Sequence, residues 1–238
     1  MAKNNEIECL ENIKLLFSSA STICYADRPL IKKILNTSIP SKDDNKFPDF
    51  IFDGGILEHF IVTGSKDYKK GCEYKIVENK SQKETAEYFR KTDKEFLDAP
   101  FKSGTLSTAS TENIFKESSY ENFVISFKKH FEDHLASLEK SGSSNDIVVF
   151  VIEQQDGRMR IFDNGRFSKF YLLTEDKKIL SYLANKSPSV NYIIFNCADS
   201  LEIIDISKIN DLIKNAKENL DIRGGSLTNI SLKVYLNI

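Results

Sequence analysis

The stretch KFPDFIFDGGILEHFIVTG, residues 46–64, decides how this chain folds. Two short apolar runs flank Asp53-Gly54, and an Asp-Gly pair in this setting is a strong signal for a β-hairpin, because a tight hairpin turn needs residues that tolerate positive φ. We therefore predict a hairpin over residues 47–63. Each of its strands carries one acidic residue, Asp49 in the first and Glu58 in the second.

The turn sets the register of the hairpin and so the relative position of the two acids. With Asp53 and Gly54 at the centre of the turn, Asp49 lies directly opposite Glu58. Opposed residues have Cβ atoms about 4.5–5.5 Å apart and share one face of the sheet. A Gly54-Gly55 turn would leave the acids on one face, one step diagonal, whereas a slip of one residue would place them on opposite faces.

The second strand of the hairpin has apolar residues on both faces. Ile56 and Phe60 share a face with Glu58, and Leu57 lies on the other face. This pattern predicts a central strand, where a charge is costly unless it is paired or coordinated. Hard oxygen ligands in a tight cluster suit Mg²⁺ or Mn²⁺. The pair therefore predicts a metal site, and the alternative is that one acid caps or pairs with a basic group without metal.

The remaining segments predict a single α/β domain spanning residues 1–238, with a mixed central sheet flanked by helices. Segment 99–113 is small and polar, and we expect a mobile loop there. Apolar periodicity predicts the following elements: helices over 5–19 and 119–139, a strand covered on both faces over 147–154, and its hairpin partner over 158–162.

Composition narrows the class of protein. The 238 residues carry a net charge of -2, so a nucleic-acid binder would have to rely on a local patch. No run approaches the roughly 18 apolar residues of a membrane span, and the N-terminus does not resemble a secretory signal. We therefore expect no membrane partner. The four cysteines are scattered, so we expect free thiols in a cytoplasmic protein, without a disulfide framework or a thiolate zinc site.

Pro48-Asp49 on one strand and Glu58 on the next resemble the active-site hairpin of the PD-(D/E)XK nuclease superfamily. In that family a Pro-Asp and an acidic-x-Lys gather a divalent metal over an α/β sheet. The resemblance implies a restriction-endonuclease-like core, with Asp49 and Glu58 as catalytic metal ligands, the main-chain carbonyl of His59 as a third ligand, and Mg²⁺ or Mn²⁺ as cofactor. The family lysine belongs two residues after the glutamate, where this chain has Phe60.

Divergent members of the family carry the lysine on the following helix, which makes Lys70 and Lys75 the candidate catalytic lysines. An alternative alignment pairs Pro48-Asp49 with Glu73-Tyr74-Lys75, but KKGCEYKIVENK, residues 69–80, is too polar for a buried strand. Basic residues near the hairpin and after the later strand are the candidate contacts to nucleic acid. They are Lys69, Lys70, Arg158 and Arg160.

Three other groups of polar residues are candidate sites. His130 and His134 have the spacing of a helical zinc pair, but they flank a phenylalanine stripe and lack the adjacent glutamate of zinc proteases, which favours packing and hydrogen bonding over zinc. His59 is expected in the core. Glu153 would add a carboxylate to the site if its strand neighbours the hairpin, and otherwise marks where that strand reaches the surface.

These observations predict a metal-dependent nuclease that hydrolyses phosphodiester bonds in DNA or RNA. The alternative is a catalytically inactive nuclease fold, or another α/β module, that binds protein or nucleic acid. The paired acids on apolar strands favour catalysis, whereas Phe60 and the negative net charge favour binding alone. Nucleic acid is the expected partner, and a homodimer is compatible with the sequence.

Overall fold

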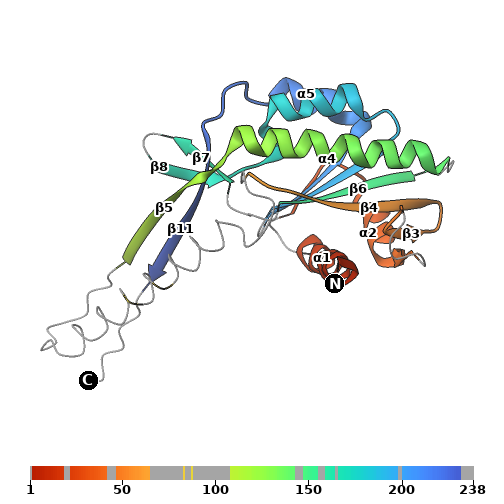
Figure 1. The fold of residues 1–238 in the computed structure, drawn as a ribbon, viewed down its shortest axis with the longest axis horizontal. Coiled ribbons are helices and arrows are strands. Elements are labelled where there is room, and N and C mark those ends of the chain that lie inside the picture. The colour runs from red at the N-terminus through yellow and green to blue at the C-terminus, as the bar shows by residue number, and fades with distance from the viewer. Residues whose placement is uncertain are drawn as a thin grey trace, which may run out of the picture.

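Figure 1 shows the main elements of the protein in a computed structural model. The chain forms a mixed seven-stranded sheet, a smaller four-stranded sheet and helices, which confirms the expected α/β fold with a mixed central sheet. The structure describes residues 2–18, 22–41, 47–64, 83, 87, 108–142, 147–154, 159–163, 166–197 and 200–231.

The seven-stranded sheet has the order β1-β10-β9-β6-β4-β3-β2. Its central strands β4, β6 and β9 run parallel to one another. Next to them, β10 is antiparallel to β9, and β3 is antiparallel to β4. The strands are β1 (Thr22–Cys24), β2 (Ile39–Pro40), β3 (Phe50–Phe52), β4 (Gly55–Val62), β6 (Ile147–Gln154), β9 (Tyr192–Cys197) and β10 (Ser200–Asp205).

The four-stranded sheet has the order β5-β11-β7-β8, and all its pairs are antiparallel. Its strands are β5 (Thr108–Ser119), β7 (Met159–Asp163), β8 (Arg166–Phe170) and β11 (Ile222–Ser231). In Figure 1, β5 and β11 form a long ribbon that extends away from the main sheet.

Two predictions fail in this smaller sheet. The strand after β6 was expected to be its hairpin partner, but β6 is already paired on both edges, by β4 and β9, so β7 pairs with β8 and β11 instead. The expected loop over 99–113 is wrong from Thr108 onwards, because β5 begins there and gains ladder hydrogen bonds from β11. Residues 99–107 lie outside the described part of the chain.

Helices cover both faces of the central sheet (Figure 1). On one face lie α1 (Ala2–Phe17) and α2 (Arg28–Thr37), and on the other lie α4 (Tyr120–Ser141), α5 (Lys177–Lys186) and α6 (Ile209–Asn215). Two short 3₁₀ helices, Leu173–Glu175 and Ile206–Lys208, connect strands to helices. Among the described helices, none combines the length and apolarity that crossing a membrane requires.

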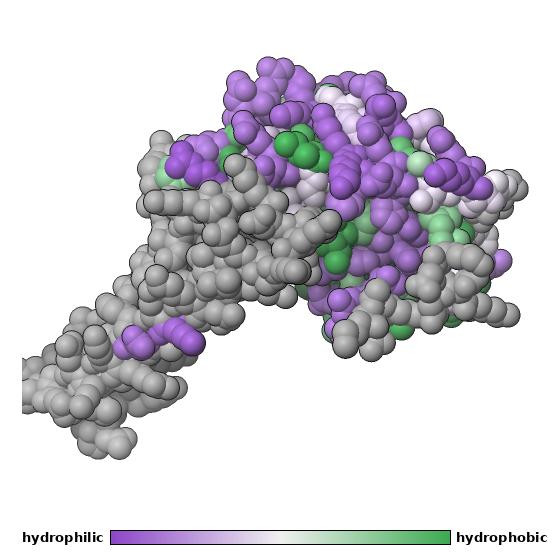
Figure 2. Space-filling model, viewed as in Figure 1, coloured by the Kyte–Doolittle hydropathy of each residue, from purple (hydrophilic) through white to green (hydrophobic). Residues whose placement is uncertain are grey.

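Strand β4 takes part in two hydrophobic cores because alternate side chains of a strand point to opposite faces. Ile56 and Phe60 pack in the core beneath α4, α5 and α6, whereas Leu57 packs in the core beneath α1 and α2. Nearly all of β4 is buried, as expected for a central strand. The face of the molecule in Figure 2 is mostly hydrophilic in its described residues, with hydrophobic residues in small separate patches.

The hairpin between β3 and β4 has the register predicted from the Asp53-Gly54 turn. Gly54 has φ 87°, a conformation that glycine adopts without strain. Phe52 pairs with Gly55, whose Cα lies so close to the next strand that an added Cβ would sit 2.2 Å from the Ile147 carbonyl oxygen. The two glycines therefore hold β4 between β3 and β6.

We predict that Gly55→Ala lowers the free energy of unfolding by about 2–3 kcal/mol, because the new methyl group would push β4 away from the main chain of β6. Urea denaturation of both proteins measures this difference. Gly54→Asn is the matched control, since asparagine tolerates positive φ and open space surrounds this position. A Gly55→Ala protein as stable as wild type would show that close packing at this point does not constrain the hairpin.

Candidate functional site

Asp49 and Glu58 lie together where the hairpin strands separate. Asp49 immediately precedes β3, and each acid side chain accepts a hydrogen bond from the opposite strand. The Asp49 main-chain N–H donates to Glu58 Oε2 at 3.1 Å, and the His59 main-chain N–H donates to Asp49 Oδ2 at 2.8 Å. The two carboxylates thus replace the ladder hydrogen bonds beyond the end of β3, and the predicted pairing of the acids is confirmed.

His134 from α4 completes this cluster. Its Nδ1 lies 2.7 Å from Glu58 Oε1, and its ring stacks on Phe60 with centroids 4.6 Å apart. Glu58 is almost fully buried, whereas a quarter of the His134 side chain is exposed. Phe60 stands two residues after Glu58, where the resemblance to the nuclease hairpin predicts a lysine, and its ring supports the imidazole. The cluster therefore consists of the Asp49 and Glu58 carboxyl groups from the hairpin and the His134 imidazole from α4.

Burial and the neighbouring charge of Glu58 together change the acid–base behaviour of Asp49. Burial, followed by the charge of Glu58, raises the pKa of Asp49 from 3.8 to about 6, although the His59 N–H and the nearby imidazoles oppose this shift. Among the described residues, no hydrogen-bond partner is found for Asp49 Oδ1. A cation beside this oxygen would relieve the repulsion, because an opposite charge favours the ionised form of a carboxyl group.

Glu202 on β10 is a buried acid with a structural role, and its surroundings differ from those of Asp49 and Glu58. It is fully buried, and burial raises its pKa to about 7. Its two oxygens accept hydrogen bonds from the main-chain N–H groups of Leu173 and Thr174 and from the Thr174 hydroxyl, at 2.7, 2.9 and 2.5 Å. Glu202 thereby ties the Leu173–Glu175 turn to the sheet, and both of its oxygens are satisfied by hydrogen bonds from that turn.

Of the predicted lysine and arginine site residues, the structure describes only Arg160. Lys69, Lys70, Lys75 and Arg158 lie outside the described residues. Arg160 is in β7 of the smaller sheet, and its guanidinium lies 4.0 Å from the centroid of the Phe170 ring. The predicted nucleic-acid contact at Arg160 therefore sits on a different sheet from Asp49 and Glu58.

His59 and Glu153 face away from the acid pair. Strand β6 does neighbour β4, as the role considered for Glu153 required, but its side chain joins His59 on the face covered by α1. His59 Nε2 lies 3.0 Å from Glu153 Oε2, so His59 is the buried and hydrogen-bonded residue that the sequence predicted. Glu153 consequently adds no carboxylate to the pair of Asp49 and Glu58.

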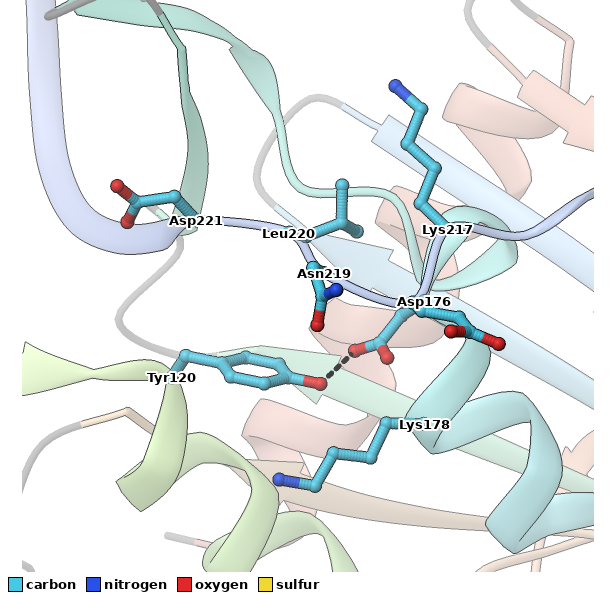
Figure 3. A pocket seen from close by; sticks show the side chains of 8 residues that line it. Tyr120, Asp176, Lys178, Lys217, Asn219, Leu220 and Asp221 are labelled. Carbon is cyan, nitrogen blue, oxygen red and sulfur yellow. Dashed lines mark hydrogen bonds between the residues drawn. The ribbon is translucent and has the colours of Figure 1, made fainter.

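A cleft of about 530 Å³ lies elsewhere, between the starts of α4 and α5 and the segment that follows α6 (Figure 3). Asp176 lies at its base, accepts from the hydroxyls of Tyr120 and Tyr171 at 2.6 and 2.8 Å, and caps α5 through the Ile179 N–H. These hydrogen bonds satisfy the buried Asp176 carboxylate within the fold, so its burial needs no ligand. Neither Asp49 nor Glu58 lines the cleft.

His134 is the site residue whose partner the sequence does not identify. The segment HFEDH predicts packing and hydrogen bonding for His134 rather than zinc binding, and the structure confirms both through the Phe60 ring and the Glu58 carboxylate. His134 follows Phe127 and Phe131 by seven and three residues, so the helical period already put it on the buried stripe of α4. The helical spacing of the phenylalanines does not show that His134 meets Glu58 of β4, because that contact joins residues far apart in the sequence.

We predict that Asp49→Asn stabilises the metal-free protein above pH 6 by about 1 kcal/mol, a value reduced for partial exposure of the site. A carboxyl group with a raised folded-state pKa holds its proton more tightly in the folded protein, so its contribution to stability falls as pH rises from about 4 to about 6. Asparagine removes that dependence and retains an oxygen for the His59 N–H.

Urea denaturation of wild type and Asp49→Asn between pH 4 and pH 8 measures this difference. Asp53→Asn, which changes an exposed residue in the turn of the same hairpin, should stay within about 0.5 kcal/mol of wild type throughout. An Asp49→Asn protein that is less stable than wild type at pH 7.5 would contradict the repulsion between Asp49 and Glu58.

Comparison of the chain with protein-family models, with curated proteins and with solved structures gives no match. The resemblance to PD-(D/E)XK nucleases therefore rests on the residues of the hairpin.

Proposed function

We propose that the protein is a metal-dependent nuclease with a restriction-endonuclease-like core, which hydrolyses phosphodiester bonds in DNA or RNA at Asp49 and Glu58. The observation that carries this proposal is the meeting of the two acids on one side of the hairpin, with a raised pKa for Asp49. The resemblance of Pro48-Asp49 and Glu58 to the nuclease hairpin supports phosphodiesters as the substrate class.

The donor set fits Mg²⁺ or Mn²⁺. Mg²⁺ is usually held by one or two carboxylates, with water and substrate oxygens completing its coordination, and the site offers two carboxylates. Asp49 and Glu58 would hold the ion, which when bound lowers the pKa of water and stabilises charge on the phosphate. Glu58 stays fixed through its bonds to the Asp49 N–H and His134, so Asp49 Oδ1 is the oxygen best placed to reach a ligand.

His134 supplies the nitrogen base in this proposal. With Nδ1 2.7 Å from the Glu58 carboxylate, the tautomer that donates from Nδ1 is favoured, which leaves the Nε2 lone pair able to accept a proton. Stacking on Phe60 fixes the plane of the ring. In this proposal His134 accepts the proton of the attacking water, from a helix that follows the hairpin in the chain.

The competing function is binding of nucleic acid or protein without cleavage. Phe60 favours it, because this buried aromatic residue occupies the position where the family lysine would stabilise charge on the phosphate. The two functions differ in their need for a bound ion, so metal binding and cleavage must be measured on the same variants.

We predict that Mn²⁺ and Mg²⁺ raise the melting temperature of wild type but not that of Asp49→Asn, because only the wild-type pair offers two carboxylates. The same variant should lose metal-dependent cleavage of supercoiled DNA, single-stranded DNA and RNA. Differential scanning fluorimetry and gel assays measure these two effects.

Asp53→Asn is the control and should keep both the metal response and the activity. Asp49→Asn is expected to fold at least as stably as wild type, so its loss of activity cannot be attributed to unfolding. Metal binding to wild type without cleavage of any of the three substrates would favour the binding function. Cleavage retained by Asp49→Asn would exclude the proposed site.

We predict that His134→Gln lowers the cleavage rate by about 10²-fold or more, because proton transfer by a positioned base contributes about 10²–10⁴-fold to many enzymes. The metal-dependent rise in melting temperature should remain, since both carboxylates are unchanged. Single-turnover cleavage by both proteins between pH 5.5 and pH 8.5 measures the rates and the pH profiles. Equal rates and pH profiles for the two proteins would rule out His134 as the base.

A further inference from the structure

A second polar cluster lies on the opposite face of β4, beneath α1. Cys9 of α1, His59 of β4 and Glu153 of β6 each place one sulfur, nitrogen or oxygen atom within 4.8 Å of the other two. Within the described part of the chain, this is the only such group of three metal-ligating side chains. Cys9 and His59 are buried, whereas almost a third of the Glu153 side chain is exposed, so the cluster reaches the surface at Glu153.

The three potential ligands differ in chemistry from the apolar residues that surround them. The core between α1, α2 and the sheet is otherwise formed by aliphatic and phenylalanine side chains. Asn196 on β9, next to Glu153 in the sheet register, donates to Cys9 Sγ at 3.9 Å. Its Oδ1 is buried and has no hydrogen-bond partner in the described structure. A buried amide oxygen without a partner is costly, and here it adjoins a group of potential ligands.

The chemistry of the cluster argues against a cysteine nucleophile. A reactive thiol needs a lowered pKa, but burial and then the charge of Glu153 raise the pKa of Cys9. His59 instead pairs with Glu153; burial opposes ionisation of that carboxyl group, but the hydrogen bond and charge of His59 outweigh it and lower the Glu153 pKa. The imidazole is therefore engaged by the carboxylate and does not activate the thiol.

A thiolate, an imidazole and a carboxylate form a ligand set that suits Zn²⁺, a borderline-soft ion bound by sulfur, nitrogen and oxygen. We propose that Cys9, His59 and Glu153 bind a Zn²⁺ ion that clamps α1 to strands β4 and β6. Three protein ligands leave the fourth tetrahedral position for water, on the side where Glu153 is exposed. This site differs in face, ligand chemistry and ion from the oxygen site of Asp49 and Glu58.

Metal titration of the full-length protein, after treatment with a chelator, tests the proposal. Wild type should bind one Zn²⁺ per chain and gain thermal stability. With Co²⁺ it should develop a near-ultraviolet thiolate-to-cobalt charge-transfer band, which requires Cys9 as a ligand. Cys9→Ser should lose the band, and Glu153→Gln should weaken Zn²⁺ binding at least 10-fold. Cys24→Ser, at a cysteine outside the cluster, should retain both properties.

Asp49→Asn should bind Zn²⁺ as wild type does, which separates this inference from the proposed nuclease site. If Cys9→Ser fails to fold, Glu153→Gln and the cobalt spectrum of wild type still decide the question. Wild-type protein that shows no charge-transfer band with Co²⁺, or Zn²⁺ binding that Glu153→Gln leaves unchanged, would overturn the proposal.

Discussion

The register of the hairpin between β3 and β4 is the constraint on which both polar clusters depend. Gly54 allows the tight turn, and Gly55 allows β4 to approach β6. Once β4 is held between two neighbours, its side chains must alternate between the two cores. A slip of one residue would turn Glu58 toward α1 and His59 toward α4, and it would separate each from its partners.

Neighbouring residues on β4 therefore experience opposite electrostatic environments. Glu58 lies beside a second carboxylate, and burial together with the charge of Glu58 raises the pKa of Asp49. His59 forms a hydrogen bond with Glu153, and although burial opposes ionisation of that carboxyl group, this hydrogen bond helps to lower its pKa. The first arrangement stores repulsion that a hard cation would relieve, whereas the second brings sulfur, nitrogen and oxygen together. The two metal sites that we propose therefore lie on opposite faces of one buried strand.

Helix α4 links packing to the chemistry proposed for the acid pair. Phe123, Phe127 and Phe131 are completely buried and anchor the helix on the sheet. Because the helix is fixed, His134 has one position, in contact with both Phe60 and Glu58. The aromatic core therefore sets the geometry of the base. The same packing explains why the structure accommodates phenylalanine where the nuclease family has lysine.

The sequence by itself determined the hairpin, its register, the pairing of Asp49 with Glu58 and the buried character of β4 and β6. These features follow from turn chemistry and from the spacing of neighbouring side chains, which act over a few residues. The sequence did not determine which strand pairs with β7, or that α4 brings His134 to Glu58, 76 residues away. It also did not bring Cys9 to His59 and Glu153. Such contacts depend on which elements pack against the two faces of the sheet, and only the tertiary structure decides that.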